Sequence, residues 1–281
     1  MQSDAPDASS QQGLGSGRSP LASWYPDPED AGRMRYWDGS QWTDRTRSRD
    51  SMPSARPYRP LAGPARVVQV LLAVYTLIVL AAVASDWLEV NLLNRLLHDP
   101  AGVLPSEVSA SDVRQVLSLL QIGATLAIAV AFVVWFHRAF ANLPALGMAP
   151  LPFGAGWAIG GWLVPILNLF RPKNIMDDIW RGSDPDRPSR LDGFWHDGPV
   201  PALVHAWWAL YLVSSLVGFV VAALIDNTTS RTVESVRTGW LATLASDVLE
   251  LVLALVCLEL VRRVTRRQQA RAARLAITPP G

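Results

Sequence analysis

The chain has 281 residues, of which 50% are hydrophobic, and a formal net charge of +1 that identifies no class of partner. Because its first 64 residues are polar, the mean hydropathy of +0.19 requires a more apolar remainder, which indicates an integral membrane protein. The single cysteine, Cys257, excludes a disulfide within the chain and a metal site built from several cysteines.

The polar N-terminal region divides by composition. Residues 1–20 are small and polar without periodic apolar positions, so we expect disorder there. Residues 49–64 are rich in Ser, Pro and Arg and predict an extended linker. The first apolar run begins near Val67, too late for a secretory signal, and the N-terminus is therefore expected to be retained.

Residues 21–48, between these parts, predict a small β meander. Short strands at Met34 to Trp37 and Gln41 to Thr43 are joined across Asp38-Gly39, a strong hairpin signal. Exposed aromatic side chains in such a module could bind a proline-rich or extended peptide. The alternative is that the tryptophans form the core of a domain too small to fold otherwise. The peptide-binding candidates are Trp24, Tyr36, Trp37 and Trp42.

This module resembles a short domain of unknown function with the pattern WYxDP…RYWDGxxWT, common at the ends of actinobacterial membrane proteins. The resemblance implies a cytoplasmic appendage and brings no known activity. The residues that carry it are Trp24-Tyr25-Pro26-Asp27-Pro28, Arg35-Tyr36-Trp37-Asp38-Gly39 and Trp42-Thr43.

Four apolar runs follow, each long enough to cross a bilayer, since a span needs about 20 mainly apolar residues. They are Val67 to Ser85, Val116 to Phe136, Ala202 to Ile225 and Trp240 to Val261. Tryptophans near many of their ends fit interfacial anchors. We therefore predict an all-α membrane fold, a four-helix transmembrane bundle within a multi-pass domain over 65–265, followed by a basic tail at 266–281.

The segment Gly156 to Phe170 decides the topology. It is shorter than a usual span, and its Gly, Pro and Asn residues lower helical propensity. If it does not cross, the basic flanks of the domain share one side, as the positive-inside rule requires. This favours four crossings, a re-entrant or interfacial segment at 156–170, and both termini on the cytoplasmic side of the cell membrane. A fifth crossing is the open alternative.

An amphipathic helix is predicted directly after this segment, from Pro172 to Gly182. Its apolar face would lie either on the cytoplasmic surface of the membrane or on protein, and the pattern does not separate the two. The residues of that face are Ile175, Met176, Ile179 and Trp180.

The same loop resembles an actinobacterial multi-pass membrane domain of unknown function, with GWxxGGWxVPIxNLxRP as the specific part. The resemblance implies a helical membrane domain over about residues 65–265 and no established activity. The residues that carry it are Trp135, Arg138, Asn142-Leu143, Gly156-Trp157-Ala158-Ile159-Gly160-Gly161-Trp162, Val164-Pro165-Ile166, Asn168-Leu169-Phe170-Arg171-Pro172 and Ile179-Trp180-Arg181.

Ionisable residues inside a membrane span indicate a functional site. Asp247 and Glu250 are three residues apart in the last run and so share one helix face. Asp247 sits at a depth similar to Gln121, with Arg114 nearer the surface. An intramembrane polar cluster of Arg114, Gln121, Asp247 and Glu250 could pass protons or a cation. The alternative is structural pairing between helices.

The sequence shows no evident nucleophile with a base and no phosphate-binding glycine loop, and its four histidines are not at metal-ligand spacing. We therefore expect no enzyme, no metal and no cofactor. The Arg-rich tail favours anionic lipid over nucleic acid. The leading functional hypothesis is a membrane-anchored interaction or assembly protein, with the lipid bilayer and another membrane or cytoplasmic protein as partners. The alternative is a small transporter or proton-linked channel using Asp247 and Glu250; an intramembrane enzyme ranks third.

Overall fold

The computed structural model describes residues 23–48, 57–98, 111–148, 151–187, 198–226 and 232–277. They belong to two units: a small sheet in the N-terminal region and a helical unit whose described residues begin at Pro57. The predictions for residues 1–20, and for the linker as far as residue 56, fall outside the described residues.

The N-terminal unit is a three-stranded antiparallel sheet in the order β1-β2-β3, which confirms the predicted meander. Its strands are β1 (Ser23–Asp27), β2 (Asp30–Trp37) and β3 (Trp42–Ser48). The turn between β2 and β3 is closed by Asp38, whose Oδ1 accepts backbone N–H bonds from Ser40 and Gln41, both at 2.8 Å. Gly39 has a φ of 104° there, a conformation that favours glycine over other residues.

The centre of the sheet is not the tryptophan cluster that we expected. Met34 in β2 and Tyr25 in β1 are buried, whereas Trp42 is 38% exposed. Trp42 opens an edge strand, where it contacts the Trp37 ring at a centroid distance of 5.3 Å. Trp24 lies in β1, but its side chain is outside the described residues. The prediction of a tryptophan core is therefore wrong for Trp42.

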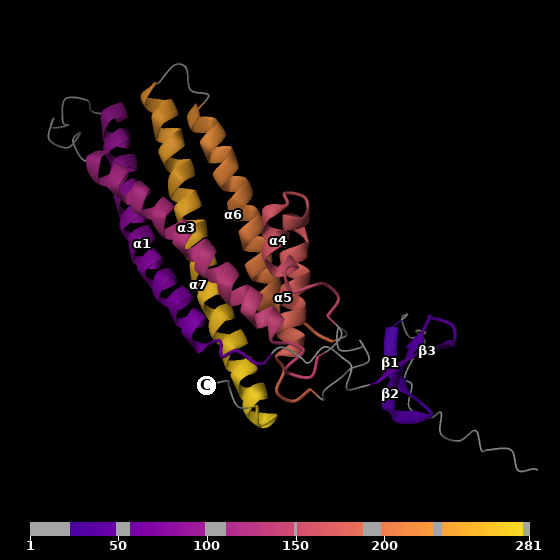
Figure 1. Ribbon diagram of the computed structural model, residues 1–281. Helices are drawn as coiled ribbons and strands as arrows, with labels where there is room; N and C mark the ends of the chain where they lie inside the picture. Colours follow the sequence, from indigo (N-terminus) through magenta and orange to yellow (C-terminus); the bar gives the residue numbers. More distant parts are fainter. Residues whose placement is uncertain are drawn as a thin grey trace, which may run out of the picture. The chain divides into compact units, whose positions relative to one another are not determined.

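The helical unit contains four long helices, each of them apolar and long enough to cross a membrane, which confirms the predicted four-helix membrane fold (Figure 1). They are α1 (Ala62–His98), α3 (Ser111–Ala141), α6 (Ala202–Asp226) and α7 (Val233–Arg274). At a rise of about 1.5 Å per residue, the 37 residues of α1 span about 55 Å. Because a bilayer's hydrocarbon core is about 30 Å thick, α1 extends beyond the membrane.

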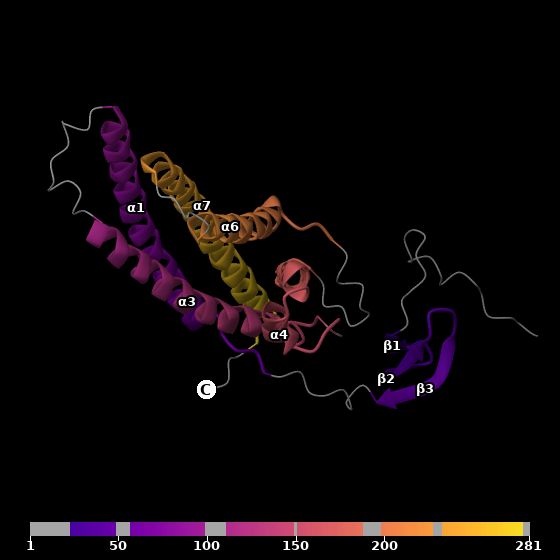
Figure 2. The ribbon, with the colours of Figure 1, turned by 90° about the horizontal axis from the view of Figure 1, so that it is seen from above.

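The long helices contact one another through α1 and α7. Helix α1 packs on α3 and on α7, and α6 packs on α7 (Figure 2). The remaining surfaces expose large apolar side chains, among them Leu77 of α1, Val130 of α3 and Phe219 of α6. Such surfaces suit acyl chains and not water, so the helices contact the lipid bilayer.

Residues 156–170 form the short helices α4 (Trp157–Leu163) and η4 (Leu167–Leu169), both too short to span a membrane. They pack against the bundle through Trp162, whose ring lies 5.9 Å from Phe132 of α3 and 5.6 Å from Tyr211 of α6. This is the packing expected of a re-entrant segment, because its broken backbone needs protein partners at membrane depth.

The amphipathic helix is α5 (Arg171–Gly182), and its apolar face lies on protein. Ile175, Met176 and Ile179 are fully buried in the main hydrophobic core, beside Phe136 and Phe140 of α3. Of the two alternatives that the sequence left open, the structure shows docking on the bundle. Figure 1 shows α4 and α5 beside the half of α6 where that helix begins.

Both ends of the helical unit meet at one end of the bundle. The amide of Asn142, just after α3, donates to the carbonyl of Arg59 at 2.8 Å and to Oε1 of Gln268 in α7 at 2.9 Å. Helix α7 continues through Arg274, so the first residues of the predicted basic tail are helical. Arg271 is buried and donates to the carbonyl of Leu146 at 2.9 Å, a protein contact where we expected lipid.

Candidate functional site

A buried cluster of charged side chains lies where α1, α3 and α7 meet. Arg114, in the first turn of α3, stands at its centre and pairs with Asp86 from α1 and with Asp247 from α7. Gln121 completes the group from α3, seven residues after Arg114 and therefore on the same face of that helix. We call these four residues the Arg114 cluster.

The guanidinium of Arg114 contacts every other member of the cluster. Its Nε lies 2.7 Å from Oδ1 of Asp86, and its Nη2 lies 3.2 Å from Oδ2 of Asp247. Its Nη1 donates to Oε1 of Gln121 at 2.8 Å, and Nε2 of Gln121 donates to Oδ1 of Asp247 at 3.1 Å. The guanidinium and the amide thus hold three helices together by charge-assisted bonds.

The cluster is shielded from solvent and carries more acid than base. Asp86 is 0%, Asp247 5% and Arg114 7% exposed. The two carboxylates, fully ionised, would leave a net charge of −1 around the one guanidinium. Burial of an uncompensated charge is costly, and proteins usually remove that cost by pairing or by protonation.

Glu250 lies one turn along α7 from Asp247 but has a different partner. The hydroxyl of Tyr75 in α1 donates to Oε2 of Glu250. The four predicted cluster residues therefore do not form one contact group. Arg114, Gln121 and Asp247 are brought together, whereas Glu250 is held separately against α1, and Glu250 is less buried than the other three.

The peptide-binding candidates of the sheet divide between its two sides. Trp37 pairs with Trp42 across β2 and β3, and the Trp42 ring also lies 6.0 Å from that of Tyr25. Tyr36 precedes Trp37 in β2, so strand alternation turns it to the opposite side. The aromatic face of the sheet is therefore Tyr25, Trp37 and Trp42, and Tyr36 is not part of it.

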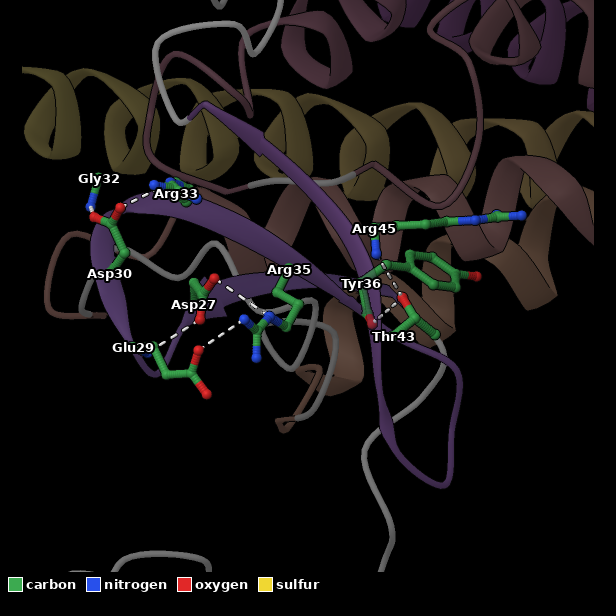
Figure 3. Close-up of polar contacts among 9 residues, drawn as sticks. All are labelled: Asp27, Glu29, Asp30, Gly32, Arg33, Arg35, Tyr36, Thr43 and Arg45. Atoms are coloured by element: carbon green, nitrogen blue, oxygen red, sulfur yellow. Dashed lines mark hydrogen bonds and ion pairs between the residues drawn. The ribbon is translucent and has the colours of Figure 1, made fainter.

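Polar contacts fix the ends of this sheet (Figure 3). Arg35 of β2 reaches Oδ2 of Asp27 at 3.3 Å and Oε2 of Glu29 at 2.9 Å, and the bond to Glu29 raises the pKa of Arg35 above its ordinary value. The hydroxyl of Thr43 donates to the carbonyl of Tyr36 at 2.8 Å. These contacts join the strands of the sheet to one another.

A family model described as a domain of unknown function, DUF4328, matches residues 99–266, which is more than half of the chain. The chain belongs to the DUF4328 family. A second model, described as a protein of unknown function, DUF2510, matches residues 22–55. These matches confirm both resemblances drawn from the motifs, to two domains of unknown function. No curated protein and no solved structure matches the chain.

The DUF4328 match begins after α1, and this matters for the cluster. Arg114, Gln121 and Asp247 lie within the matched residues, whereas Asp86 lies before them. Sequence reasoning missed Asp86 because the first apolar run appeared to end at Ser85. The signal was its position in the buried stripe of α1. The residues of that stripe are Val68, Leu72, Tyr75, Val79, Ala82, Asp86, Val90 and Leu93, which follow one another at intervals of three or four.

The Arg114 cluster is held together by ion pairs and hydrogen bonds. Among the described residues, no group of three or more His, Cys, Asp or Glu side chains is placed to hold a metal ion.

Proposed function

We propose that this DUF4328 protein is a membrane-anchored interaction protein whose N-terminal sheet binds an extended, proline-rich peptide segment of a partner. The exposed ring of Trp42 carries the proposal, because it is backed by the rings of Trp37 and Tyr25 on a compact unit distinct from the helical one. Aromatic faces of this kind accept the preformed polyproline helix with little loss of entropy. The proposal assigns no catalytic role to the chain.

The partner would be a cytoplasmic protein or the cytoplasmic part of a membrane protein. The start of α1 and the end of α7 lie at one end of the bundle, joined through Asn142. Basic residues gather in the segments at that end, among them Arg138 and the arginines of the last turns of α7. By the positive-inside rule this end faces the cytoplasm, in a cell membrane.

The test uses the full chain in its membrane, with a photo-crosslinking amino acid in place of Ser40, beside the aromatic face. A crosslinked partner should be obtained from the parent, be lost with Trp42→Ala, and be competed by a synthetic proline-rich peptide. Thr46→Ala, on the same strand, is the matched control and should keep the crosslink. A crosslink that survives Trp42→Ala and is not competed by the proline-rich peptide would show that the aromatic face is not the binding surface.

A second candidate function is proton-linked transport, and the excess acid of the Arg114 cluster favours it. Buried carboxylates between helices are the usual proton carriers of transporters. Purified protein in vesicles with an internal pH-sensitive dye tests this candidate. If Asp247→Asn combined with Glu250→Gln leaves every proton and solute flux unchanged, the chain is not such a transporter.

A further inference from the structure

The two acids of the Arg114 cluster differ in how many of their carboxylate oxygens have a hydrogen-bond or ion-pair partner. Both oxygens of Asp247 have partners, Oδ1 in the Gln121 amide and Oδ2 in the guanidinium. Asp86 has its ion pair through Oδ1, and its Oδ2, buried completely, has no hydrogen-bond partner in the part of the chain that the structure describes. A buried carboxylate oxygen without a donor is rare in folded proteins, since it loses its hydration without replacement.

We propose that the Arg114 cluster is a proton-binding site, in which Asp86 and Asp247 together hold one exchangeable proton at neutral pH. This goes beyond the peptide-binding function, and it rests on the site named for the transport candidate without requiring that protons cross the membrane. The proton comes from water and adds to a carboxylate oxygen; on release it returns to water, and no other bond changes.

Charge balance is the first argument for the proton. With one proton shared by the two acids, the cluster carries one negative and one positive charge and is neutral. Without it, a net negative charge would be buried on the stripe of α1 that also carries Ala82 and Val90. Two acids beside each other in a poorly solvated site commonly titrate as a pair that keeps one proton between them.

Geometry is the second argument. The carboxyl groups of Asp86 and Asp247 contact Nε and Nη2 of the same guanidinium, which brings the two acids close together. Because ionised carboxylates only accept hydrogen bonds, they repel each other at such a separation, whereas a protonated acid becomes a donor. A proton on Oδ2 of Asp86 would supply the missing partner of this atom. Asp247 needs no donor of its own, so Asp86 is the better carrier.

The other charged and titratable groups near the site do not supply the missing charge. On α1, Tyr75 is occupied by Glu250, and Glu89 adds a further acid one turn beyond Asp86. On α7, Glu250 is another acid, and Trp240 places its ring 6.0 Å from the guanidinium of Arg114. Arg237 of α7 bonds Asn94 of α1 at 2.6 Å, toward the end of α1. Arg114 is thus the one cation in contact with the two acids among the described residues.

A proton fits this site better than a metal cation does. The guanidinium already contacts both acids, and its positive charge would repel a second cation. A proton needs only one oxygen and no coordination shell. Arg114 lies in the first turn of α3, so the site is close to the start of that helix.

Infrared spectroscopy of the full-length protein in lipid nanodiscs tests the proposal directly, because the carbonyl stretch of a protonated carboxyl is distinct and shifts in deuterium oxide. At pH about 7 the parent should show this band, and Asp86→Asn should remove it. Glu259→Gln is the matched control: Glu259 is an exposed acid on α7 that pairs with Arg263 at 2.7 Å, and its replacement should leave the band in place. Glu250→Gln should also leave it.

A parent spectrum without a protonated carboxyl at neutral pH would overturn the proposal, and this reading needs no variant to fold. A band that disappears with Glu250→Gln but persists in Asp86→Asn and Asp247→Asn would also overturn it, since the proton would then belong to the Tyr75 pair. The dye-loaded vesicles separate this site from transport. A band lost in Asp86→Asn, with no proton flux in the parent, supports the proton site and refutes the transport function.

Discussion

Replacing Arg114 by methionine removes the only positive charge in contact with Asp86 and Asp247 among the described residues, and it leaves a side chain of similar length. If the two interhelical contacts were worth no more than ordinary hydrogen bonds between membrane helices, roughly 0.6 kcal/mol each, the change would cost about 1 kcal/mol. Removing one partner of a buried ion pair costs about 3–5 kcal/mol, because the other charge is left uncompensated. Since both acids are at least nine-tenths buried, we expect the larger loss.

The assay is reversible unfolding of the purified protein by SDS in bicelles at pH about 7, followed by tryptophan fluorescence. The surface control is Arg263→Met, which removes an exposed pair with Glu259 and should cost less than about 1 kcal/mol. The triple variant with Arg114→Met, Asp86→Asn and Asp247→Asn has no buried charge in the cluster and should recover most of the loss. Lowering the pH should also reduce the loss, because protonation neutralises the two orphaned acids.

Two results would refute this reasoning. If Arg114→Met costs no more than Arg263→Met, the cluster is hydrated in the membrane and its charges are not buried in the energetic sense. If the triple variant is no more stable than the single one, the loss comes from packing around the guanidinium and not from unpaired charge.

Three further predictions concern the sheet, the short helices and the core. The backbone N–H of Gln41 and the N–H and hydroxyl of Ser40 donate to the carboxylate of Asp38 and lower its pKa below the ordinary 3.8. These bonds therefore stabilise the folded sheet above pH 3.8, and the stabilisation is lost as the pH falls through the lowered pKa. Asp38→Ala should abolish this acid-dependent loss of stability in an NMR titration of the sheet. A Cβ on Gly161 would lie 2.8 Å from Cγ and 3.1 Å from Cβ of Arg171, so Gly161→Ala should lower stability by about 1–3 kcal/mol in thermal unfolding. Gly160→Ala, whose nearest neighbour is the Trp157 ring at 3.6 Å, should cost less. Trp135 donates to Thr265 at 3.1 Å, so Trp135→Phe and Thr265→Val should each cost about 1 kcal/mol or more, and the double variant should cost less than their sum.

The sequence predicted the existence of the elements well, because their signals are local. Apolar runs of membrane length, a hairpin turn at Asp38-Gly39 and the Pro172 start of α5 each depend on neighbouring residues alone. The ends of the helices were harder to place. Helix α1 continues for thirteen residues beyond Ser85, to His98, because the end of an apolar run does not mark the end of a helix. Asp86 was overlooked for this reason.

The choice between lipid and protein for the apolar face of α5 could not be made from its own residues. Ile175 and Met176 would suit either lipid or protein. The structure decides for protein, because these two residues belong to the same hydrophobic core as Phe136 and Phe140 of α3. Trp42 illustrates the reverse problem. A tryptophan in a very small domain is expected to be core, yet its place at the start of an edge strand leaves the ring exposed. Tertiary neighbours determine both outcomes.

The two carboxylates of α7 show how one helix face can serve two neighbours. Asp247 and Glu250 are three residues apart and point in similar directions, yet their partners come from different helices. Asp247 meets Arg114 of α3, and Glu250 meets Tyr75 of α1. Helix α6 packs on α7 but contributes no residue to either polar pair. Its rings of Trp207 and Tyr211 contact the ring of Trp162 in α4. Charge thus joins α1, α3 and α7, whereas aromatic packing joins α3, α4 and α6. A change in protonation at the Arg114 cluster would consequently act on the first three helices directly and reach α6 only through α7 and α3.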